Sequence, residues 1–227
     1  MKWFDREILP IRHRYNCQVN DPAYPPPFGV LGRLLMKWHH ARHGVPTEDF
    51  RSSERAIEVP LVIDFLSNCV RAKPVIEFGC VLPYYILKRR NHIVYDLADQ
   101  HPDNVRRDIR TLTDDDLRGV VISISTLEHI GTGEYGIKAS DVSAVDVLKR
   151  IIANAKSYFI TFPLGCNKTL DDFVANATDL NEKYVTRAAT DSNDWMVVEK
   201  ADLTDVMKRY GTYLRANTIC VLMKGCQ

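Results

Sequence analysis

Short apolar runs that end abruptly in glycine or polar residues mark the chain from residue 74 onward. Val75–Phe78 runs into Gly79, and Val120–Ile124 runs into Ser125 and further polar residues. Runs of this length that are mostly apolar are typical of strands buried on both faces of a parallel sheet. The carboxyl ends of such strands open into a crevice, so the pattern predicts a small-molecule site where these two runs end.

Further strands and helices alternate along the same part of the chain. The predicted strands are 92–95, 105–109, 158–162, 195–198 and 218–223. The predicted helices are 83–89, 141–155 with Ser140 or Asp141 as the cap, 170–177 and 203–210. Alternating strands and helices favour an α/β fold, in which a doubly wound, mostly parallel, Rossmann-like sheet is flanked by helices and joined by right-handed crossovers.

The first fifty residues have a different pattern and lie before this alternation. The proline-rich segment 21–29 cannot form a helix or an inner strand, because proline lacks the amide donor and fixes φ. A helix is predicted over 53–70, and Pro60 is expected to kink it or mark its start. We therefore divide the chain into 1–50, an N-terminal arm and helix that is a candidate lid, and 51–227, the Rossmann-like domain.

Composition and charge disfavour several kinds of partner. With 30 basic and 29 acidic residues, the 227-residue chain has a formal net charge of +1, so no overall attraction to nucleic acid or to an anionic membrane is expected. No apolar run approaches the roughly twenty residues of a membrane span, and early charged residues interrupt any signal peptide. We therefore expect a cytoplasmic protein with no nucleic acid or membrane partner.

Cysteine and histidine spacings do not predict a metal site. The six cysteines include no closely spaced pair of the zinc or redox type, which favours spare thiols in a reducing compartment. His39 and His43 have the i, i+4 spacing of a helix, but no third ligand lies nearby, so a solvated helix end is favoured. The acidic run 114–116 is expected at a helix N-terminus, where negative charge is favourable.

Short motifs follow four predicted strands in order along the chain. They are Glu77-x-Gly79, Asp96, Asp108-Ile109 and Leu127-Glu128-His129. In this order they resemble the motifs of class I S-adenosylmethionine-dependent methyltransferases. The strings 123–131 and 161–167 are more specific, and they resemble a mostly microbial branch of that superfamily with a glycine-poor first motif. The resemblance covers residues 54–224 and implies an enzyme that uses S-adenosylmethionine.

The resemblance implies a cofactor role for each motif. Gly79 would let the backbone approach the methionine half of the cofactor, where a Cβ would intrude. Asp96 would accept hydrogen bonds from the ribose hydroxyls, and Asp108 would reach the adenine amino group, with Ile109 packed on the purine face. Glu77 would hold the amides of the first loop or reach a ligand ammonium. Three neighbours complete the predicted cofactor contacts: Cys80, Ser125 and Leu127.

The resemblance also implies where the methyl acceptor lies. His129 is at the sheet edge expected for catalysis, and the ordinary pKa of histidine suits a base for an oxygen acceptor. Glu128, Tyr135 and Asn167 follow strand ends on the same side and are predicted to contact the substrate. The glycines of 131–136 are typical of a flap that closes over an acceptor. We expect metal-independent methyl transfer, at oxygen, to a small molecule or to a sugar of a glycan.

Other interpretations of these residues stay open. Glu77, Asp96 and Asp108 are also explained as strand-end, capping or loop acids. Asp99 competes with Asp96 for the ribose, and His129 is equally explained as a structural histidine.

The first loop departs from the pattern of the family it resembles. Val81 and Pro83 stand where two further glycines are usual. Pro83 fits the first turn of a following helix, whereas the Val81 side chain must point away from the ligand. These two residues favour an alternative, a catalytically silent methyltransferase-like binding or assembly module. A nicotinamide dehydrogenase is disfavoured, because the chain lacks the Gly-x-Gly-x-x-Gly turn.

Overall fold

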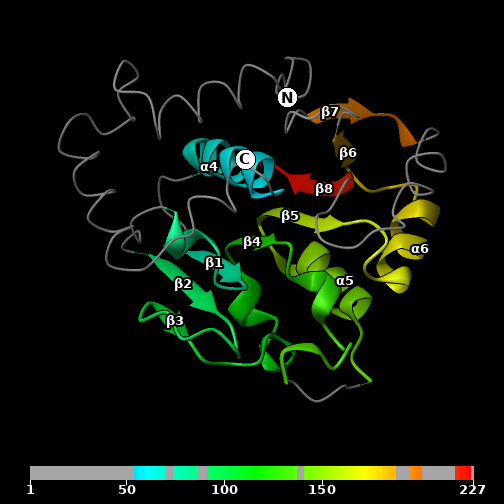
Figure 1. The fold of residues 1–227 in the computed structure, drawn as a ribbon. Helices are drawn as coiled ribbons and strands as arrows, with labels where there is room; N and C mark the ends of the chain where they lie inside the picture. The colour runs from blue at the N-terminus through cyan, green and yellow to red at the C-terminus, as the bar shows by residue number, and fades with distance from the viewer. Residues whose placement is uncertain are drawn as a thin grey trace, which may run out of the picture.

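The computed structural model describes residues 54–69, 74–85, 91–136, 141–187, 195–200 and 218–225, and the statements below concern these residues (Figure 1). The predicted N-terminal arm and candidate lid at 1–50 and the predicted helix 203–210 lie outside them. Most of the predicted helix 83–89 lies outside them too.

A mixed sheet of eight strands forms the centre of the described structure. Its strands are β1 (Val75–Phe78), β2 (His92–Tyr95), β3 (Asn104–Val105), β4 (Val120–Ile124), β5 (Ser157–Pro163), β6 (Glu182–Arg187), β7 (Trp195–Val198) and β8 (Thr218–Lys224). Their spatial order is β3-β2-β1-β4-β5-β8-β6-β7. The first five are parallel to one another, whereas β8 is antiparallel to β5 and β6, and β7 is antiparallel to β6. The direction of strand order changes between β1 and β4, which confirms the predicted Rossmann-like α/β fold.

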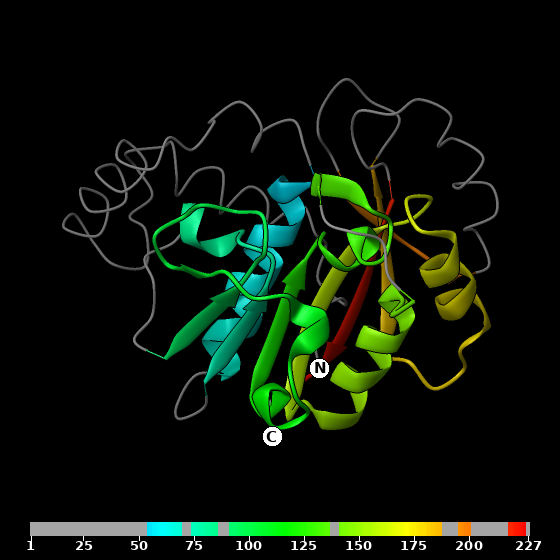
Figure 2. The same cartoon turned by 90° about the horizontal axis from the view of Figure 1, so that it is seen from below.

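Helices cover both faces of this sheet (Figures 1 and 2). α4 (Arg55–Cys69) packs on one face, and α5 (Ala144–Asn154) and α6 (Lys168–Asn176) pack on the other. Neighbouring strand residues point to opposite faces, so on β4 Ile122 joins the core under α4 while Val121 joins the core under α5. Every residue of β1, β4 and β5 is buried, which is why their sequences are almost continuously apolar.

The start of α5 corrects the predicted cap. The helix begins at Ala144, and its N-cap is Ser143 rather than Ser140 or Asp141. The Ser143 hydroxyl accepts a hydrogen bond from the Asp146 amide at 3.2 Å, and the Asp146 carboxylate accepts one from the Ser143 amide at 3.0 Å. This reciprocal capping box satisfies two amides that a helix start otherwise leaves without partners.

Three other elements differ from the sequence prediction. β3 ends at Val105 instead of extending over 105–109, because Ile109–Thr111 forms a turn of 3₁₀ helix. α4 runs through Pro60, which neither starts nor ends it. The sequence pattern does not predict β6 (Glu182–Arg187). Its first residues are charged, so the apolar positions that pair with β8 do not form a recognisable run in the sequence.

Two observations bear on the expected surroundings of the protein. Within the described ranges, no helix is both long enough and apolar enough to span a bilayer. Cys80, Cys166 and Cys220 are free thiols, but Cys69 at the end of α4 is disulfide-bonded. The expectation of spare thiols is therefore wrong for Cys69.

The capping box gives a direct test of where α5 begins. Ser143→Ala removes the capping hydroxyl and should lower the free energy of unfolding by about 1 kcal/mol. Asp141→Ala, at one of the positions that the sequence pattern indicates, is the matched control and should change it by less than about 0.5 kcal/mol. Denaturant unfolding followed by circular dichroism measures both, and equal losses would contradict the observed cap.

Candidate active site

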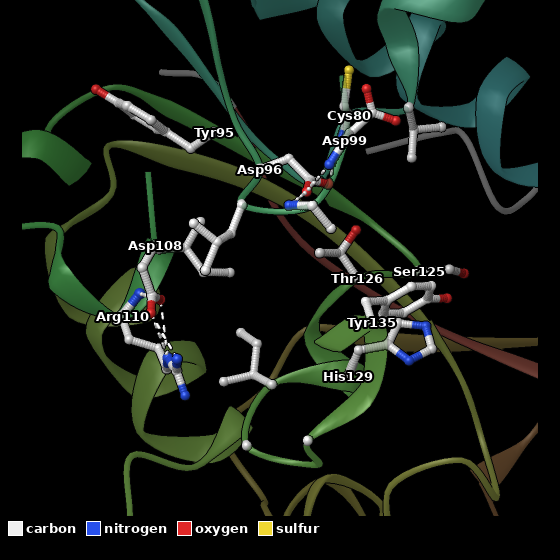
Figure 3. Close-up of a pocket in the computed structure, with 18 of the residues that line it drawn as sticks. Cys80, Tyr95, Asp96, Asp99, Asp108, Arg110, Ser125, Thr126, His129 and Tyr135 are labelled. Atoms are coloured by element: carbon white, nitrogen blue, oxygen red, sulfur yellow. Dashed lines mark hydrogen bonds and ion pairs between the residues drawn. The ribbon is translucent and has the colours of Figure 1, made fainter. Parts of the chain in front are cut away.

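A cavity of about 410 Å³ opens where β1, β2 and β4 end (Figure 3). Asp108 and Arg110 lie on one side of it, and His129 and Tyr135 lie on the opposite side. Asp96 lies between these two groups. Eight predicted site residues line the cavity: Gly79, Cys80, Asp96, Asp108, Ile109, Ser125, His129 and Tyr135. Four predicted site residues do not line it: Glu77, Leu127, Glu128 and Asn167.

The carboxylate of Glu77 holds the loop after β1 from behind. Glu77 is fully buried in β1, and its Oε1 accepts hydrogen bonds from the amides of Val81 at 2.9 Å and Leu82 at 2.7 Å. Its Oε2 lies 2.7 Å from Nε2 of His92 on β2, a close polar contact without the alignment of a good hydrogen bond. This arrangement matches the predicted loop-holding role. Burial away from the cavity contradicts the other prediction, a contact with a ligand ammonium.

Gly79 is fixed by the backbone and by a neighbouring side chain. Its φ of +80° lies in the left-handed region, where residues with a Cβ are strained. A Cβ on Gly79 would lie 2.0 Å from Oγ1 of Thr126. The predicted reason for this glycine is close approach of a cofactor, but the atom that excludes a side chain belongs to Thr126.

Val81 and Pro83 leave the cavity open. Val81 lines the wall, and it precedes a short 3₁₀ helix, Leu82–Tyr84, whose first turn contains Pro83. Proline is well tolerated in a first turn, because the amide it lacks would have no partner there. The remaining volume of about 410 Å³ is within the usual range of small-molecule pockets. This loop therefore accommodates both departures from a glycine-rich sequence.

Asp96 joins the loops that follow β1 and β2. Its Oδ2 accepts a hydrogen bond from the Cys80 amide at 3.1 Å, and its Oδ1 accepts from the amides of Ala98 at 2.8 Å and Asp99 at 3.0 Å. A carboxylate has about four acceptor positions, so roughly one remains for a ligand. Asp96 therefore shapes the cavity and still has acceptor capacity facing it.

Asp99, the alternative ribose ligand, lines the cavity but is engaged by protein donors. The Tyr84 hydroxyl lies 3.1 and 3.0 Å from its two carboxylate oxygens, and the His101 amide donates to Oδ1 at 2.6 Å. The thiol of Cys80 is nearby, and burial together with the Asp99 carboxylate raises the pKa of Cys80 far above its ordinary value. The thiol therefore stays protonated and is a poor nucleophile.

Arg110 takes most of the acceptor capacity of the Asp108 carboxylate. It accepts hydrogen bonds from the Arg110 amide at 2.9 Å, from Nε at 2.9 and 3.0 Å, and from Nη2 at 2.7 Å. The side-chain hydrogen bonds from Arg110 are the main reason why the pKa of Asp108 lies below its ordinary value. The amide, Nε and Nη2 are three N–H donors, so Arg110 leaves about one acceptor position of Asp108 for an adenine amino group. Ile109 also lines the cavity and is partly buried.

His129 has a carboxyl group near each ring nitrogen. Its Nδ1 contacts Oε2 of Glu134, and its Nε2 lies 3.6 Å from Oε1 of Glu128. Burial raises the pKa of Glu128 well above its ordinary value, which favours the neutral form of this carboxyl group. A carboxylate at Nδ1 favours the tautomer that carries the proton there, which leaves the lone pair on Nε2. The Tyr135 ring meets the imidazole edge-on, with centroids 5.0 Å apart.

Three predicted contacts support the cavity wall from behind. Leu127 is fully buried in the apolar core, and Glu128 is only 2 % exposed. Asn167 caps α6 by accepting hydrogen bonds from two of its first amides, and its Nδ2 donates to the Glu128 carbonyl at 3.0 Å. In this structure these side chains position the segment that carries His129 rather than face a ligand.

Several residues that line the cavity were not predicted from the sequence, among them Arg55, Thr126 and Arg110. Thr126 and Arg110 are close neighbours of predicted residues, but nothing in their spacing singles them out. Arg55 had a signal, because it is followed by Glu58 at the i, i+3 spacing of a helix that is otherwise largely apolar. Burying a charge pair on one face of a helix costs free energy, and the position of Arg55 at the cavity wall explains why the pair is there.

No protein-family model and no curated protein matches the sequence. Among solved structures, the chain is similar to protein 1320 of Thermoplasma acidophilum, with 9% identity over 76% of this chain and 88% of that chain and a TM-score of 0.41. It is also similar to the N-terminal domain of EvdMO1 with SAH bound, with 12% identity over 74% of this chain and 80% of that chain and a TM-score of 0.35.

A third similar structure is the plantazolicin methyltransferase BpumL in complex with a triazolic desmethylPZN analog and SAH. The identity is 9%, the match covers 97% of this chain and 98% of that chain, and the TM-score is 0.40. Similarity at TM-scores this low carries no weight in assigning a function. The assignment therefore rests on the geometry of the cavity.

The buried contacts of Glu77 predict a graded loss of stability. Glu77→Ala leaves two loop amides and His92 without their partner and should lower the free energy of unfolding by about 3–5 kcal/mol. Glu77→Gln keeps an oxygen for the amides and should cost clearly less. Denaturant unfolding compares the two variants. Equal losses would show that the negative charge of Glu77, rather than an acceptor oxygen at the loop amides, provides the stabilisation.

Proposed function

We propose that this protein binds S-adenosylmethionine in the cavity and transfers its methyl group, without a metal, to an oxygen of a small-molecule or glycan acceptor. One observation carries the proposal: the loops that bear Gly79, Asp96 and Asp108 come from three different strands and line one cavity. The strand order puts that cavity beside the point where the direction of the sheet order changes, which is where ligands bind in folds of this kind.

The chemistry of the cavity wall suits a nucleoside. Asp96 retains acceptor capacity for ribose hydroxyls, and Ile109 offers an apolar surface for a purine face. Gly79 and Cys80 would lie beside the part of the cofactor that follows the ribose. When bound, S-adenosylmethionine supplies a methyl carbon that is already activated by its positive sulfur, so the protein needs chiefly to align an acceptor and to exclude water.

His129 is the residue that would take the proton of an acceptor hydroxyl. Glu134 orients the ring through Nδ1, so Nε2 is the basic nitrogen. Burial raises the pKa of Glu128, the carboxyl group beside Nε2, and so disfavours a competing negative charge there. As the acceptor oxygen gains the methyl group, its proton passes to Nε2. Glu134 then stabilises the imidazolium through the contact at Nδ1.

The pairing of Asp108 with Arg110 favours one competing proposal. If the remaining acceptor position of Asp108 does not reach the adenine, the predicted contact does not form, and the chain would be a catalytically silent module that keeps the fold. Measured turnover separates the two functions, because a silent module does not transfer a methyl group even where it retains some affinity for the cofactor.

Calorimetric titration tests cofactor binding. The wild-type chain should bind S-adenosylmethionine and its demethylated product, S-adenosylhomocysteine (SAH), with micromolar dissociation constants, and should not bind NAD. Asp96→Ala removes a carboxylate that faces the cavity and organises two loops, and it should weaken binding by about ten- to a hundredfold. Asp172→Ala, on the exposed face of α6, is the matched control. Absence of binding by the wild-type chain would contradict the proposed function.

Methyl transfer from isotopically labelled donor to a panel of hydroxylated small molecules and sugars tests the role of His129. His129→Asn should bind SAH like the wild-type chain and should lower turnover by about 10²–10⁴-fold, the usual contribution of a general base. Glu134→Gln, which retains a hydrogen-bond acceptor, should cause a smaller loss. Unchanged turnover by His129→Asn would remove the imidazole from the mechanism, and transfer only to nitrogen or sulfur acceptors would contradict the oxygen assignment.

A further inference from the structure

A cation lines the cavity next to β4 and has no part in the mechanism above. Arg55 is the first residue of α4, its side chain is 21% exposed, and it lines the cavity. Its Nη1 donates hydrogen bonds to Oε2 of Glu58 at 2.7 Å and to the carbonyl of Ile124 at 3.3 Å. Because Ile124 is the last residue of β4, these contacts hold the guanidinium at the ligand edge of the sheet.

The carboxylate that pairs with Arg55 is buried and accepts hydrogen bonds from several side chains. Glu58 is fully buried, and besides Arg55 it accepts hydrogen bonds from the hydroxyls of Ser125 at 2.6 Å and Thr161 at 2.6 Å. The cluster joins α4, β5 and the residue after β4. Burying an ion pair costs free energy that an apolar pair would not, so a pair kept at a cavity wall indicates use of the charge.

The charge of Arg55 is secured by its surroundings. Burial works against the positive charge, but the carboxylates of Glu58 and Glu54 outweigh it, so the pKa of Arg55 lies above its ordinary value. Of the described residues that line the cavity, Arg55 and Arg110 are the arginines, and Arg110 is bound to Asp108 at the other end. The β4 end of the cavity is therefore suited to an anionic group.

The order of the strands indicates which anionic group of a ligand would lie at the β4 end of the cavity. The residues that line the cavity follow the spatial order β3, β2, β1, β4, with Asp108 after β3, Asp96 after β2, Gly79 after β1 and Ser125 after β4. S-adenosylmethionine has its parts in the order adenine, ribose, sulfur and amino acid. If the adenine lies beside Ile109 and the ribose beside Asp96, the amino acid lies at the β4 end.

We propose that Arg55 binds the carboxylate of the amino-acid part of the methyl donor, with Glu58 as the residue that positions its guanidinium. This inference rests on the proposed function and adds a binding residue from outside the four sequence motifs. A planar guanidinium matches a carboxylate in charge and in the spacing of its donors. Glu58 is too deeply buried to contact the ligand itself, and it acts through Arg55.

A pair of ligands isolates this contact. SAH carries the amino-acid part, whereas methylthioadenosine has the same nucleoside and sulfur without it. Calorimetry of the wild-type chain should show tighter binding of SAH than of methylthioadenosine. Arg55→Gln should weaken SAH binding by about ten- to a hundredfold and leave methylthioadenosine binding unchanged. Arg55→Lys keeps the charge and should restore part of the preference for SAH.

Two further variants keep the test decisive. Arg55→Gln leaves the buried charge of Glu58 without its cation, so the double variant Arg55→Gln/Glu58→Gln, which removes both charges and keeps acceptors for Ser125 and Thr161, guards against misfolding. It should show the same loss of preference for SAH. Arg118→Gln, at an exposed arginine away from the cavity, controls for the change in net charge.

The outcomes separate this inference from the proposed function. Equal losses of SAH and methylthioadenosine binding in the folded double variant would assign Arg55 a purely structural role and overturn the inference. An unchanged preference for SAH, or a wild-type chain with no such preference, would overturn it as well and leave the proposed function intact. If the wild-type chain binds neither ligand, both proposals fail.

Discussion

The parallel pairing of β1 with both β2 and β4 is the constraint on which the rest of the structure depends. Glu77 pairs in register with Val94 on one side and with Ile122 on the other. Because the three strands run in the same direction, the residues that follow them emerge at one edge of the sheet. Chain segments that are far apart in sequence thereby line one cavity, and the burial of these strands on both faces fixes their register.

Three carboxylates, of which those of Glu77 and Glu58 are fully buried, then hold that edge in shape. Glu77 binds the amides of the loop after β1, Asp96 ties that loop to the one after β2, and Glu58 connects α4 to the residue after β4. Each carboxylate has its negative charge balanced by several donors, as a low-dielectric environment requires. Carboxylates therefore preorganise the cavity. The sequence pattern predicts that acidic residues of this kind bind the ligand, but only some of them face the cavity.

Local pattern was sufficient to predict the sheet and its ligand edge. The strand ends at Gly79, Asp96 and Ser125 could be found because apolar runs and the residues that stop them are adjacent in sequence. Three side-chain contacts could not be predicted in this way. They are the pairing of Asp108 with Arg110, the close approach of Thr126 to Gly79 and the capping of α6 by Asn167. These contacts depend on side-chain directions, which the spacing of residues in the sequence does not determine. The strand β6 was not predicted, because it is recognisable only from its pairing with β8.

A crystal structure of the chain with SAH would show whether these strand ends form the cofactor site. We expect the ligand in this cavity, with the purine against Ile109, the ribose hydroxyls at the carboxylate of Asp96 and the amino-acid part toward β4. Binding of SAH elsewhere on the protein, or in the cavity with its nucleoside toward β4, would contradict this expectation.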